Sequence, residues 1–429
     1  RHQQNDQRSQ QCDPDAIADP RLRDALQQLL GRGVRFALAD EGELRAAVAR
    51  AFDLAPATAA ADDAVAMLDE LVLQAWLHRA SDIHLEPDDS GYRVRLRIDG
   101  ELRVLRSGIA RSLGAALVSR LKVQARLDIA ETRAPQDGSL VHRLASEDGR
   151  GIDIRVATAP TRLGERATLR ILGADERPAS FSDLGMMPGM ERRIEGLLER
   201  PSGLLLLTGP TGCGKTTTLY AALRRLNRPG VNLMTVEDPV ECLLPGISQM
   251  QVDDAGKLSF AGAMRSLLRH DPDVLMVGEI RDRETAEVAL RASLTGHLVL
   301  STLHTSTAAG AVTRLVDMGC EPYLVAATLA GVVSQRLVRR LCPHCRREVD
   351  GVWQAPGCLR CHDLGYAGRI ALCELFVPGA SARSAITAGA EIPAIEAAAE
   401  HFTAMADDAR GKIAAGLTSL AEVRQQVEL

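Results

Sequence analysis

Lysine is scarce in this chain. The 51 basic residues include only four lysines, at positions 122, 215, 257 and 412, and the rest are arginines. A lysine inside a motif is therefore harder to explain by chance than an arginine. The formal net charge of −5 excludes a surface that is basic throughout, which is typical of proteins that bind polyanions without specificity.

Aromatic residues and long apolar runs are also few. Only 3% of the residues are aromatic, which argues against base-stacking platforms for single-stranded nucleic acid, and we expect no nucleic-acid partner. No apolar run reaches the ~18–20 residues of a membrane-spanning helix. The first 15 residues, RHQQNDQRSQQCDPD, lack the apolar core of a signal peptide. These absences favour a cytoplasmic protein, whose nine cysteines would be available to bind metal.

Two apolar patterns follow each other along the 429 residues, a length that allows two or three domains. The first pattern begins with the amphipathic helix DDAVAMLDELVLQAWLHRA and continues with strands in SDIHLEP, YRVRLRIDGEL and RGIDIRVATAP. In YRVRLRI, the apolar Val94, Leu96 and Ile98 alternate with arginines, so we expect them on one face of a strand. In the second pattern, helices alternate with the apolar strands GLLLLTG, VNLMTVE, DVLMVGE and HLVLSTLH. It predicts an α/β fold with a mostly parallel sheet and an active site at the carboxyl ends of its strands.

A phosphate-binding loop is predicted at residues 209–216. GPTGCGKT matches G-x-x-x-x-G-K-[ST], follows the strand GLLLLT and opens a helix, which is the context that this motif requires. We expect Lys215 to reach the β- and γ-phosphates of ATP and the Thr216 hydroxyl to bind Mg²⁺. A helix N-terminus lowers the pKa of a thiol, so a reactive Cys213 is a further hypothesis. The predicted nucleotide-binding residues are Gly209, Pro210, Thr211, Gly212, Cys213, Gly214, Lys215, Thr216 and Thr217.

Carboxylates follow two other predicted strands. TVEDPVE contains Glu237, Asp238 and Glu241, and in DVLMVGEIRD the place of the acid that usually helps to hold Mg²⁺ is taken by Gly278. Glu279 comes next, and on a straight strand it would point to the opposite face. Glycine allows the bend that Glu279 would need in order to face the phosphates. Either carboxylate could be the base that orients water.

Two histidines flank the strand in HLVLSTLH. His297 and His304 are seven residues apart, so on one strand they face opposite sides. We therefore do not expect them to share a metal. One of them, which we take to be His304, is a candidate to hydrogen-bond the γ-phosphate.

A zinc site is predicted late in the chain. Two CxxC pairs stand twelve residues apart: Cys342, Cys345, Cys358 and Cys361. Such pairs supply tetrahedral thiolate ligands to Zn²⁺, and four of them leave no open position, so the metal would be structural. Disulfides and free thiols are the alternatives, and a cytosolic location disfavours disulfides. His344 and His362 lie beside these cysteines but are surplus as ligands.

Together these motifs resemble the type II/type IV secretion superfamily of ATPases, and within it the assembly ATPases of type II secretion systems. The resemblance covers residues ~62–429, and residues 20–52 resemble the end of the family's N-terminal domain. It is carried by GPTGCGKTTTLY, TVEDPVE, DPDVLMVGEIRDRETAEVALRASLTGHLVLSTLHT, QRLVRRLCPHC, GYAGR, SDIHLEP, RLRIDGELR, SRLKVQARLDIAETRAPQDG and DIRVATAPTRLGERATLRIL. The implied domains are a polar tail with part of a partner-docking domain (1–61), a PAS-like α/β N2 domain (62–175), a linker (176–186), and a RecA-like ATPase domain (187–429) with a zinc insert (342–361).

The resemblance implies a homo-hexameric cytoplasmic motor that lies peripherally at the inner membrane. Such motors hydrolyse ATP to drive pseudopilus assembly and protein export. Their partners are the L-type inner-membrane protein of the system, through its cytoplasmic domain, and a polytopic platform protein. The family has G-E where this chain has Gly278 and Glu279, so the resemblance implies that Glu279 is the acid that approaches the phosphates, for water activation or Mg²⁺ organisation, with Glu237 as its partner.

The N2 arginines that reach the phosphates in the family match Arg155 in DIRVAT and Arg170 in TLRIL. Arg265, Arg269 and Arg369 match arginines implicated in contacts between domains or subunits.

Some positions depart from the family pattern, and other functions compete. Cys213 replaces the usual serine of the loop, Cys373 stands where an aromatic or aliphatic residue is usual, and the N-terminal domain is expected to be short or truncated.

The nearest alternative function is that of a type IV pilus assembly ATPase. A retraction ATPase is disfavoured by the cysteine motif, and a nucleic-acid motor by the net acidity. An inert P-loop scaffold would bind ATP without turnover.

Overall fold

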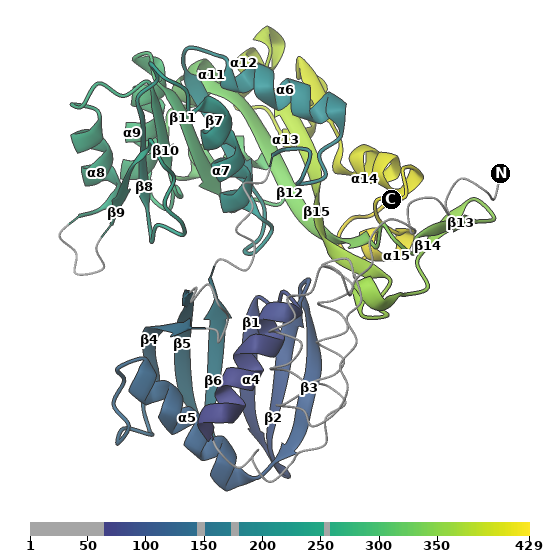
Figure 1. Ribbon diagram of the computed structural model, residues 1–429. Coiled ribbons are helices and arrows are strands. Elements are labelled where there is room, and N and C mark those ends of the chain that lie inside the picture. Colours follow the sequence, from purple (N-terminus) through teal and green to yellow (C-terminus); the bar gives the residue numbers. More distant parts are fainter. Residues whose placement is uncertain (1–63, 144–150, 173–179, 253–257) are drawn as a thin grey trace, which may run out of the picture. The chain divides into compact units, whose positions relative to one another are not determined.

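Two large β-sheets, of six and eight strands, organise the residues that the structure describes, and β13 (Arg347–Val349) and β14 (Val352–Gln354) form a small third sheet (Figure 1). The structure is a computed structural model, which describes residues 64–143, 151–172, 180–252 and 258–429. The predicted tail and docking domain at 1–61 therefore lie outside the described residues. None of the helices in the described ranges has the length and apolar character of a membrane span.

The first sheet is antiparallel, with the strand order β3-β2-β1-β6-β5-β4. Two helices, α4 (Ala64–Leu77) and α5 (Arg111–Gln124), cover one of its faces (Figure 1). Its strands are β1 (Asp82–Asp88), β2 (Gly91–Ile98), β3 (Glu101–Ile109), β4 (Gln136–Arg143), β5 (Gly151–Thr161) and β6 (Gly164–Ile171).

Alternation along β2 separates the two faces of this sheet. Val94 and Leu96 are buried in the core beneath the helices, and Ile98 packs at the margin of that core, so the predicted apolar face is confirmed. The pattern YRVRLRIDGEL, however, predicts one strand where the structure has two. Asp99 and Gly100 adopt positive φ values of 50° and 93°, a conformation that favours turns, and they separate β2 from β3.

The second sheet is mostly parallel, as the sequence predicts. Its strand order is β16-β15-β12-β7-β11-β10-β8-β9, and the neighbours from β12 to β9 are parallel, while β15 and β16 add antiparallel pairs. The four predicted strands are β7 (Gly203–Thr208), β8 (Leu233–Glu237), β10 (Val274–Val277) and β11 (Leu298–Leu303). The alternation rules do not find β9 (Ser248–Gln251), β12 (Leu329–Leu341), β15 (Tyr366–Val377) and β16 (His401–Thr403).

Helices cover both faces of the second sheet, which explains why its central strands are apolar throughout. Leu205 and Leu207 of β7 pack beneath α6 (Pro188–Leu198) and α7 (Lys215–Leu226). Leu204 and Leu206 point to the other core. That core is covered by α8 (Phe260–Leu267), α9 (Arg283–Leu294), α10 (Gly310–Asp317), α11 (Pro322–Thr328), α12 (Ala380–Thr387) and α13 (Ile392–Ala397). The last helices are α14 (Met405–Ala414) and α15 (Leu420–Val423).

The packed part of the second sheet's region begins before residue 187. Phe181 and Met186 fall within the predicted linker (176–186), yet both are buried in the core beneath α6 and α7. Burial of large apolar side chains of this kind typically contributes ~1.5–3 kcal/mol each. The end of the predicted linker is thus attached to the P-loop side of the chain.

Candidate nucleotide site and cysteine cluster

The predicted phosphate-binding loop lies between β7 and α7, the strand–loop–helix arrangement that its motif requires. Gly209 has a φ of 141°, and a side chain there would overlap the carbonyl oxygen of Gln335, so this turn needs glycine. α7 begins at Lys215, whose ammonium donates to the carbonyl oxygens of Gly209 and Pro210 at 2.7 and 3.0 Å. Burial lowers the pKa of Lys215. The lysine thus lies against the loop that it is predicted to serve.

Gln335 of β12 ties this loop to the neighbouring strand. The Gln335 amide donates to the carbonyl oxygen of Cys213 at 2.7 Å and accepts from the Thr218 hydroxyl at 2.9 Å. Its neighbour Arg336 donates to the carbonyl oxygen of Ser306 at 2.9 Å. Sequence reasoning missed both residues, because QRLVRRL carries no local sign that it will pair with β7. Only the parallel register of β12 and β7 brings them to the loop.

The hypothesis of a reactive Cys213 is wrong. Only 4% of this residue is exposed, and burial raises the pKa of its thiol. Desolvation of the thiolate outweighs the nearby Lys215 and the helix N-terminus, both of which favour the charged form. Cys213 therefore serves the loop through its backbone.

Glu279 lies just beyond the end of β10, as the predicted bend requires. The strand ends at Val277, and the Thr302 hydroxyl donates to the Gly278 carbonyl oxygen at 2.8 Å. The Glu279 carboxylate is 3.5 Å from Nε2 of His304, forms an ion pair with Arg281 and interacts electrostatically with Lys215.

Arg281 extends this cluster to the end of the neighbouring strand. Besides its ion pair with Glu279, its guanidinium lies 3.7 Å from the Asp238 carboxylate, which follows β8. The structure therefore gathers Lys215, Glu279 and His304 at the carboxyl ends of three neighbouring strands, where the active site of a parallel sheet is expected. The sequence rules give no reason to select Arg281 from so many arginines.

Glu237 lies in a different environment from Glu279. It is 3% exposed, and its carboxylate accepts hydrogen bonds from Tyr220, from Thr235 at 2.6 Å and from Gln249 at 3.0 Å. Burial and this acidic partner raise the pKa of Tyr220. These three donors make Glu237 an acceptor that ties α7, β8 and β9 together, and its predicted partnership with Glu279 stays a prediction.

His297 and His304 lie at opposite ends of β11. Nδ1 of His297 lies 2.9 Å from the carbonyl oxygen of Ala292, at the amino end of the strand. His304 follows the carboxyl end, beside Glu279. The two histidines therefore lie apart, and a phosphate contact of His304 stays a prediction.

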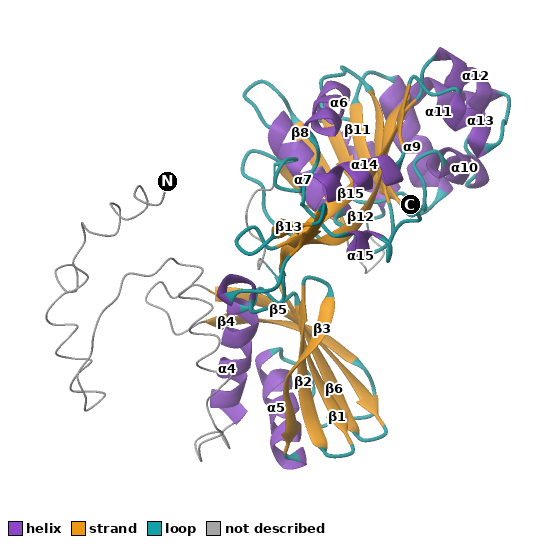
Figure 2. Ribbon diagram, turned by 90° about the vertical axis from the view of Figure 1, so that its right-hand side faces the viewer, coloured by secondary structure: helices purple, strands orange, loops and turns teal. Residues whose placement is uncertain are grey.

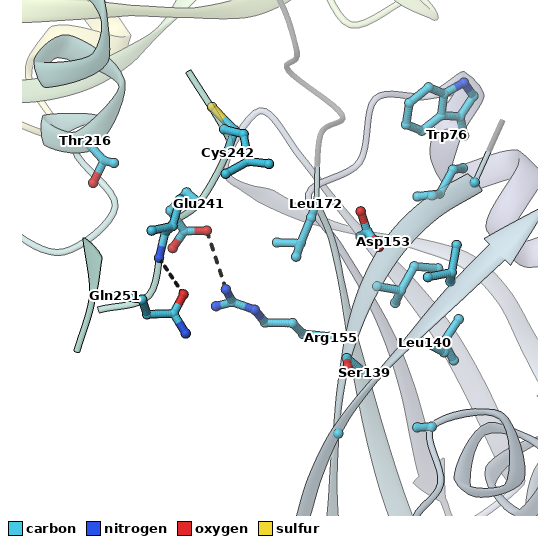
Figure 3. A pocket seen from close by; sticks show the side chains of 18 of the residues that line it. Trp76, Ser139, Leu140, Asp153, Arg155, Leu172, Thr216, Glu241, Cys242 and Gln251 are labelled. Carbon is cyan, nitrogen blue, oxygen red and sulfur yellow. Dashed lines mark hydrogen bonds and ion pairs between the residues drawn. The ribbon is translucent and has the colours of Figure 1, made fainter. Parts of the chain in front are cut away.

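The two predicted phosphate-binding arginines occupy paired positions on neighbouring strands of the first sheet, Arg155 on β5 and Arg170 on β6. The Arg155 guanidinium lies 3.8 Å from the Glu241 carboxylate (Figure 3). Arg155, Glu241, Thr216 and Thr217 line one cavity of about 1600 Å³, all within the unit formed by residues 59–429. Arg170 lies beside Arg155 but outside that lining, and its Nε donates to Asp82 at 3.0 Å.

The other three arginines singled out by the sequence have separate surroundings. Arg265 of α8 pairs with Glu284 at 2.7 Å, and Arg269 donates to the carbonyl oxygen of Arg265. Arg369 lines a smaller cavity, of about 270 Å³, together with the outer side of the P-loop.

The four cysteines of the insert form one cluster between β12 and β15. Their sulfur atoms all lie within 4.8 Å of one another, and three pairs are 3.7, 3.8 and 3.9 Å apart. A tetrahedral zinc with Zn–S bonds of ~2.3 Å implies sulfur–sulfur distances of ~3.8 Å, so the cluster fits the ion. The eight cysteines in the described ranges are all free thiols, which excludes the disulfide alternative for this motif. Neither His344 nor His362 belongs to the cluster.

Comparison with known proteins identifies the family. The family model for type II/IV secretion system proteins matches residues 59–425. The chain belongs to this family. This family member is 52% identical to type II secretion system protein HxcR of Pseudomonas aeruginosa. The alignment spans 361 residues, which are 84% of the chain and 76% of the relative. Type II secretion system protein E of Klebsiella pneumoniae is 46% identical over 86% of the chain and 77% of its own length.

A solved structure supports the same assignment. The crystal structure of the pilus retraction motor PilT with bound ADP matches 84% of this family member and 97% of its own chain, with a TM-score of 0.59 and 28% identity. The P-loop, its sheet and the family together make the chain an ATPase with an α/β P-loop fold, whose family uses nucleotide and Mg²⁺.

Proposed function

We propose that this protein is the homo-hexameric motor of a type II secretion system, which hydrolyses ATP to drive pseudopilus assembly and protein export. The likeness to type II secretion proteins along most of both chains carries the proposal. The proposed domains are the partner-docking region (1–61), the N2 domain (62–175), a linker (176–186) and the ATPase domain (187–429).

In the proposed site, the P-loop holds the phosphates. Its backbone N–H groups and the N-terminus of α7 favour negative charge. Lys215, which donates to the carbonyl oxygens of Gly209 and Pro210, would turn to the β- and γ-phosphates, and the Thr216 hydroxyl would bind Mg²⁺. The ion would neutralise charge that develops on the phosphates during transfer.

Glu279 is our candidate for the group that orients the attacking water. It follows the strand next to β11 and lies near both Lys215 and His304, so a water between Glu279 and the γ-phosphate would be within reach. His304, which lies beside Glu279, is our candidate to hydrogen-bond the γ-phosphate. Glu237 already accepts three hydrogen bonds, which favours Glu279 over Glu237 as the base.

Arg155 and Arg170 are proposed to complete the site with positive charge. Guanidinium groups stabilise the charge on transferring phosphate, and the cavity that Arg155 lines also contains Thr216 and Thr217 of the P-loop helix. Because such arginines must close onto a loop of another region or subunit, we expect slow hydrolysis that depends on oligomerisation.

The cysteine cluster is proposed to bind one structural Zn²⁺ through Cys342, Cys345, Cys358 and Cys361. A four-thiolate site has no open position, so the metal would stabilise the insert and supply no step of hydrolysis.

We propose a cytoplasmic location, peripheral at the inner membrane. The partners would be the L-type protein, bound through its cytoplasmic domain, and the polytopic platform protein of the same system. These assignments rest on the resemblance to the assembly ATPases of type II secretion systems, and the relatives' names support the secretion system itself. No nucleic-acid partner is proposed.

The test is co-purification of the full chain with the cytoplasmic domains of an L-type protein and a platform protein, with phosphate release measured in parallel. We expect stable binding to the secretion partners and faster ATP turnover in their presence. Matched domains from a type IV pilus system serve as the control. Binding and stimulation by the pilus domains alone would replace the secretion proposal with pilus assembly.

A Glu279→Gln variant separates the site assignment from the partner assignment. It keeps the size of the side chain but removes the carboxylate, so partner binding should persist while turnover falls by at least ~100-fold. Unchanged turnover would exclude Glu279 as the group that orients water.

A further inference from the structure

The motif SDIHLEP forms a polar row on the open face of the first sheet. Ile83 and Leu85 of β1 are buried in the core beneath the helices, so Asp82, His84 and Glu86 lie on the opposite face. Figure 2 shows α4 and α5 on one side of the strands only, within the described part of the chain. Even so, the three polar residues are only 5%, 7% and 5% exposed.

Arginines of the flanking strands account for this burial. Glu86 contacts Arg93 at 3.1 Å, Arg95 at 2.6 Å and Arg166 at 3.1 Å, which occupies both carboxylate oxygens. These charged partners lower the pKa of Glu86 in spite of the burial that raises it. The row thus places two buried carboxylates, Asp82 and Glu86, between strands that carry arginines.

Asp82 occupies a special position in this row, because its neighbours lead to the nucleotide site. It pairs with Arg97 across β2 and with Arg170 across β6, and Arg170 in turn pairs with Arg155 on β5. These four residues therefore lie side by side on β2, β1, β6 and β5, in the order Arg97, Asp82, Arg170 and Arg155. Like charges at directly opposed positions repel each other, and Asp82 is the carboxylate in that line.

The contact between Asp82 and Arg170 uses only part of the guanidinium. Nε of Arg170 donates to Oδ1 of Asp82 at 3.0 Å, while Oδ2 accepts from the Ser81 hydroxyl at 2.8 Å and lies 3.8 Å from Nε of Arg97. A guanidinium has five N–H donors in a fixed plane. A bond at Nε leaves the two terminal amino groups available, and the Arg170 side chain is 65% exposed.

We propose that Asp82 is a positioning residue that holds Arg170 by Nε and presents its terminal amino groups to the phosphates of ATP. This inference rests on the proposed function, which assigns phosphate binding to Arg170. Asp82 itself touches no phosphate. It fixes the plane of the guanidinium and offsets the repulsion between Arg170 and Arg155.

The test compares Asp82→Asn, Arg170→Gln and the double variant in the purified full chain, with kcat and KM for ATP measured separately. A displacement of ~1 Å in a positioned group can cost up to ~100-fold in rate, and we expect Asp82→Asn to lower kcat about tenfold with KM within about twofold. The double variant should be no slower than Arg170→Gln alone. The matched control is Asp88→Asn, which removes the same charge at the other end of β1, where the half-buried Asp88 accepts hydrogen bonds from Ser90, and should leave kcat unchanged.

Each result has a defined meaning. Additive losses in the double variant, or an unchanged kcat in Asp82→Asn while Arg170→Gln is slow, would overturn the positioning role. If Arg170→Gln itself leaves kcat unchanged, the proposed phosphate contact fails instead. Should Asp82→Asn not fold, Arg170→Lys gives an independent answer. The lysine ammonium cannot bind Asp82 and a phosphate at the same time in the fixed plane that a guanidinium provides. Full activity in that variant would therefore also contradict the inference.

Discussion

The two sheets carry their polar groups in different places. In the second sheet, helices bury both faces of the central strands, and the candidate groups Lys215, Glu279 and His304 lie beyond the carboxyl ends of strands. In the first sheet, helices cover one face, and Asp82 and Arg170 lie along the other. Each group at the strand ends belongs to a short motif that can be recognised by itself, whereas Asp82 and Arg170 on the sheet face are brought together only by strand register. We therefore expect substitutions at the strand ends to abolish ATP hydrolysis, and substitutions on the sheet face only to slow it by misplacing a phosphate-binding side chain.

The largest effect is expected at the strand ends. Lys215→Ala removes the ammonium that lies against the P-loop, so phosphate release should fall to background, by at least ~100-fold. The measurement is steady-state ATP turnover of the full chain, with thermal unfolding to verify the fold. Arg192→Ala, on the exposed side of α6, is the control. Residual turnover near that of the unmodified chain would show that hydrolysis does not use this loop.

This difference between the sheets also explains what could be predicted from the sequence. The P-loop, the bend after Val277 and the cysteine pairs are contiguous patterns, and local rules found them because each pattern fixes its own geometry. The contacts of Gln335 with the P-loop and of Asp82 with Arg170 depend on strand register. Register is set along the whole sheet by the hydrophobic pattern and the turns, and neither contact lies within one short motif. The burial of Cys213 likewise depends on tertiary packing rather than on its motif.

The cysteine cluster differs from both sheets, because we expect a metal ion rather than strand pairing to fix the positions of its side chains. Replacing Cys342 and Cys345 by serine should lower the zinc content from about one ion per chain to none. Structural zinc contributes to folding, so the insert should also loosen. Trp353 of β14 (Val352–Gln354) donates to the carbonyl oxygen of Ala414 at 3.2 Å, and its fluorescence can report the change.

The matched control for this prediction is Cys242→Ser, at an exposed cysteine outside the cluster. It should leave metal content and fluorescence unchanged. ATP binding should survive in both variants, because the P-loop does not include these cysteines. Zinc content that stays the same after replacement of Cys342 and Cys345 would exclude the proposed site.

The smallest expected effect concerns acid stability of the first sheet, where polar groups are buried along strands. Burial lowers the pKa of His84 and of His142, and Arg166 lowers that of His84 further. The unfolded chain takes up these protons near a pKa of ~6.5, whereas the folded chain takes them up only at lower pH. The unfolded state therefore binds more protons in that window, so the free energy of unfolding should decrease as the pH falls below ~6.5. The free energy of unfolding can be measured by urea titration of a Trp353→Phe variant at pH 7.5 and 5.5, with the fluorescence of Trp76 of α4 as the signal. Adding His84→Asn and His142→Asn should weaken this pH dependence, and an equal decrease without the two histidines would assign the effect to other groups.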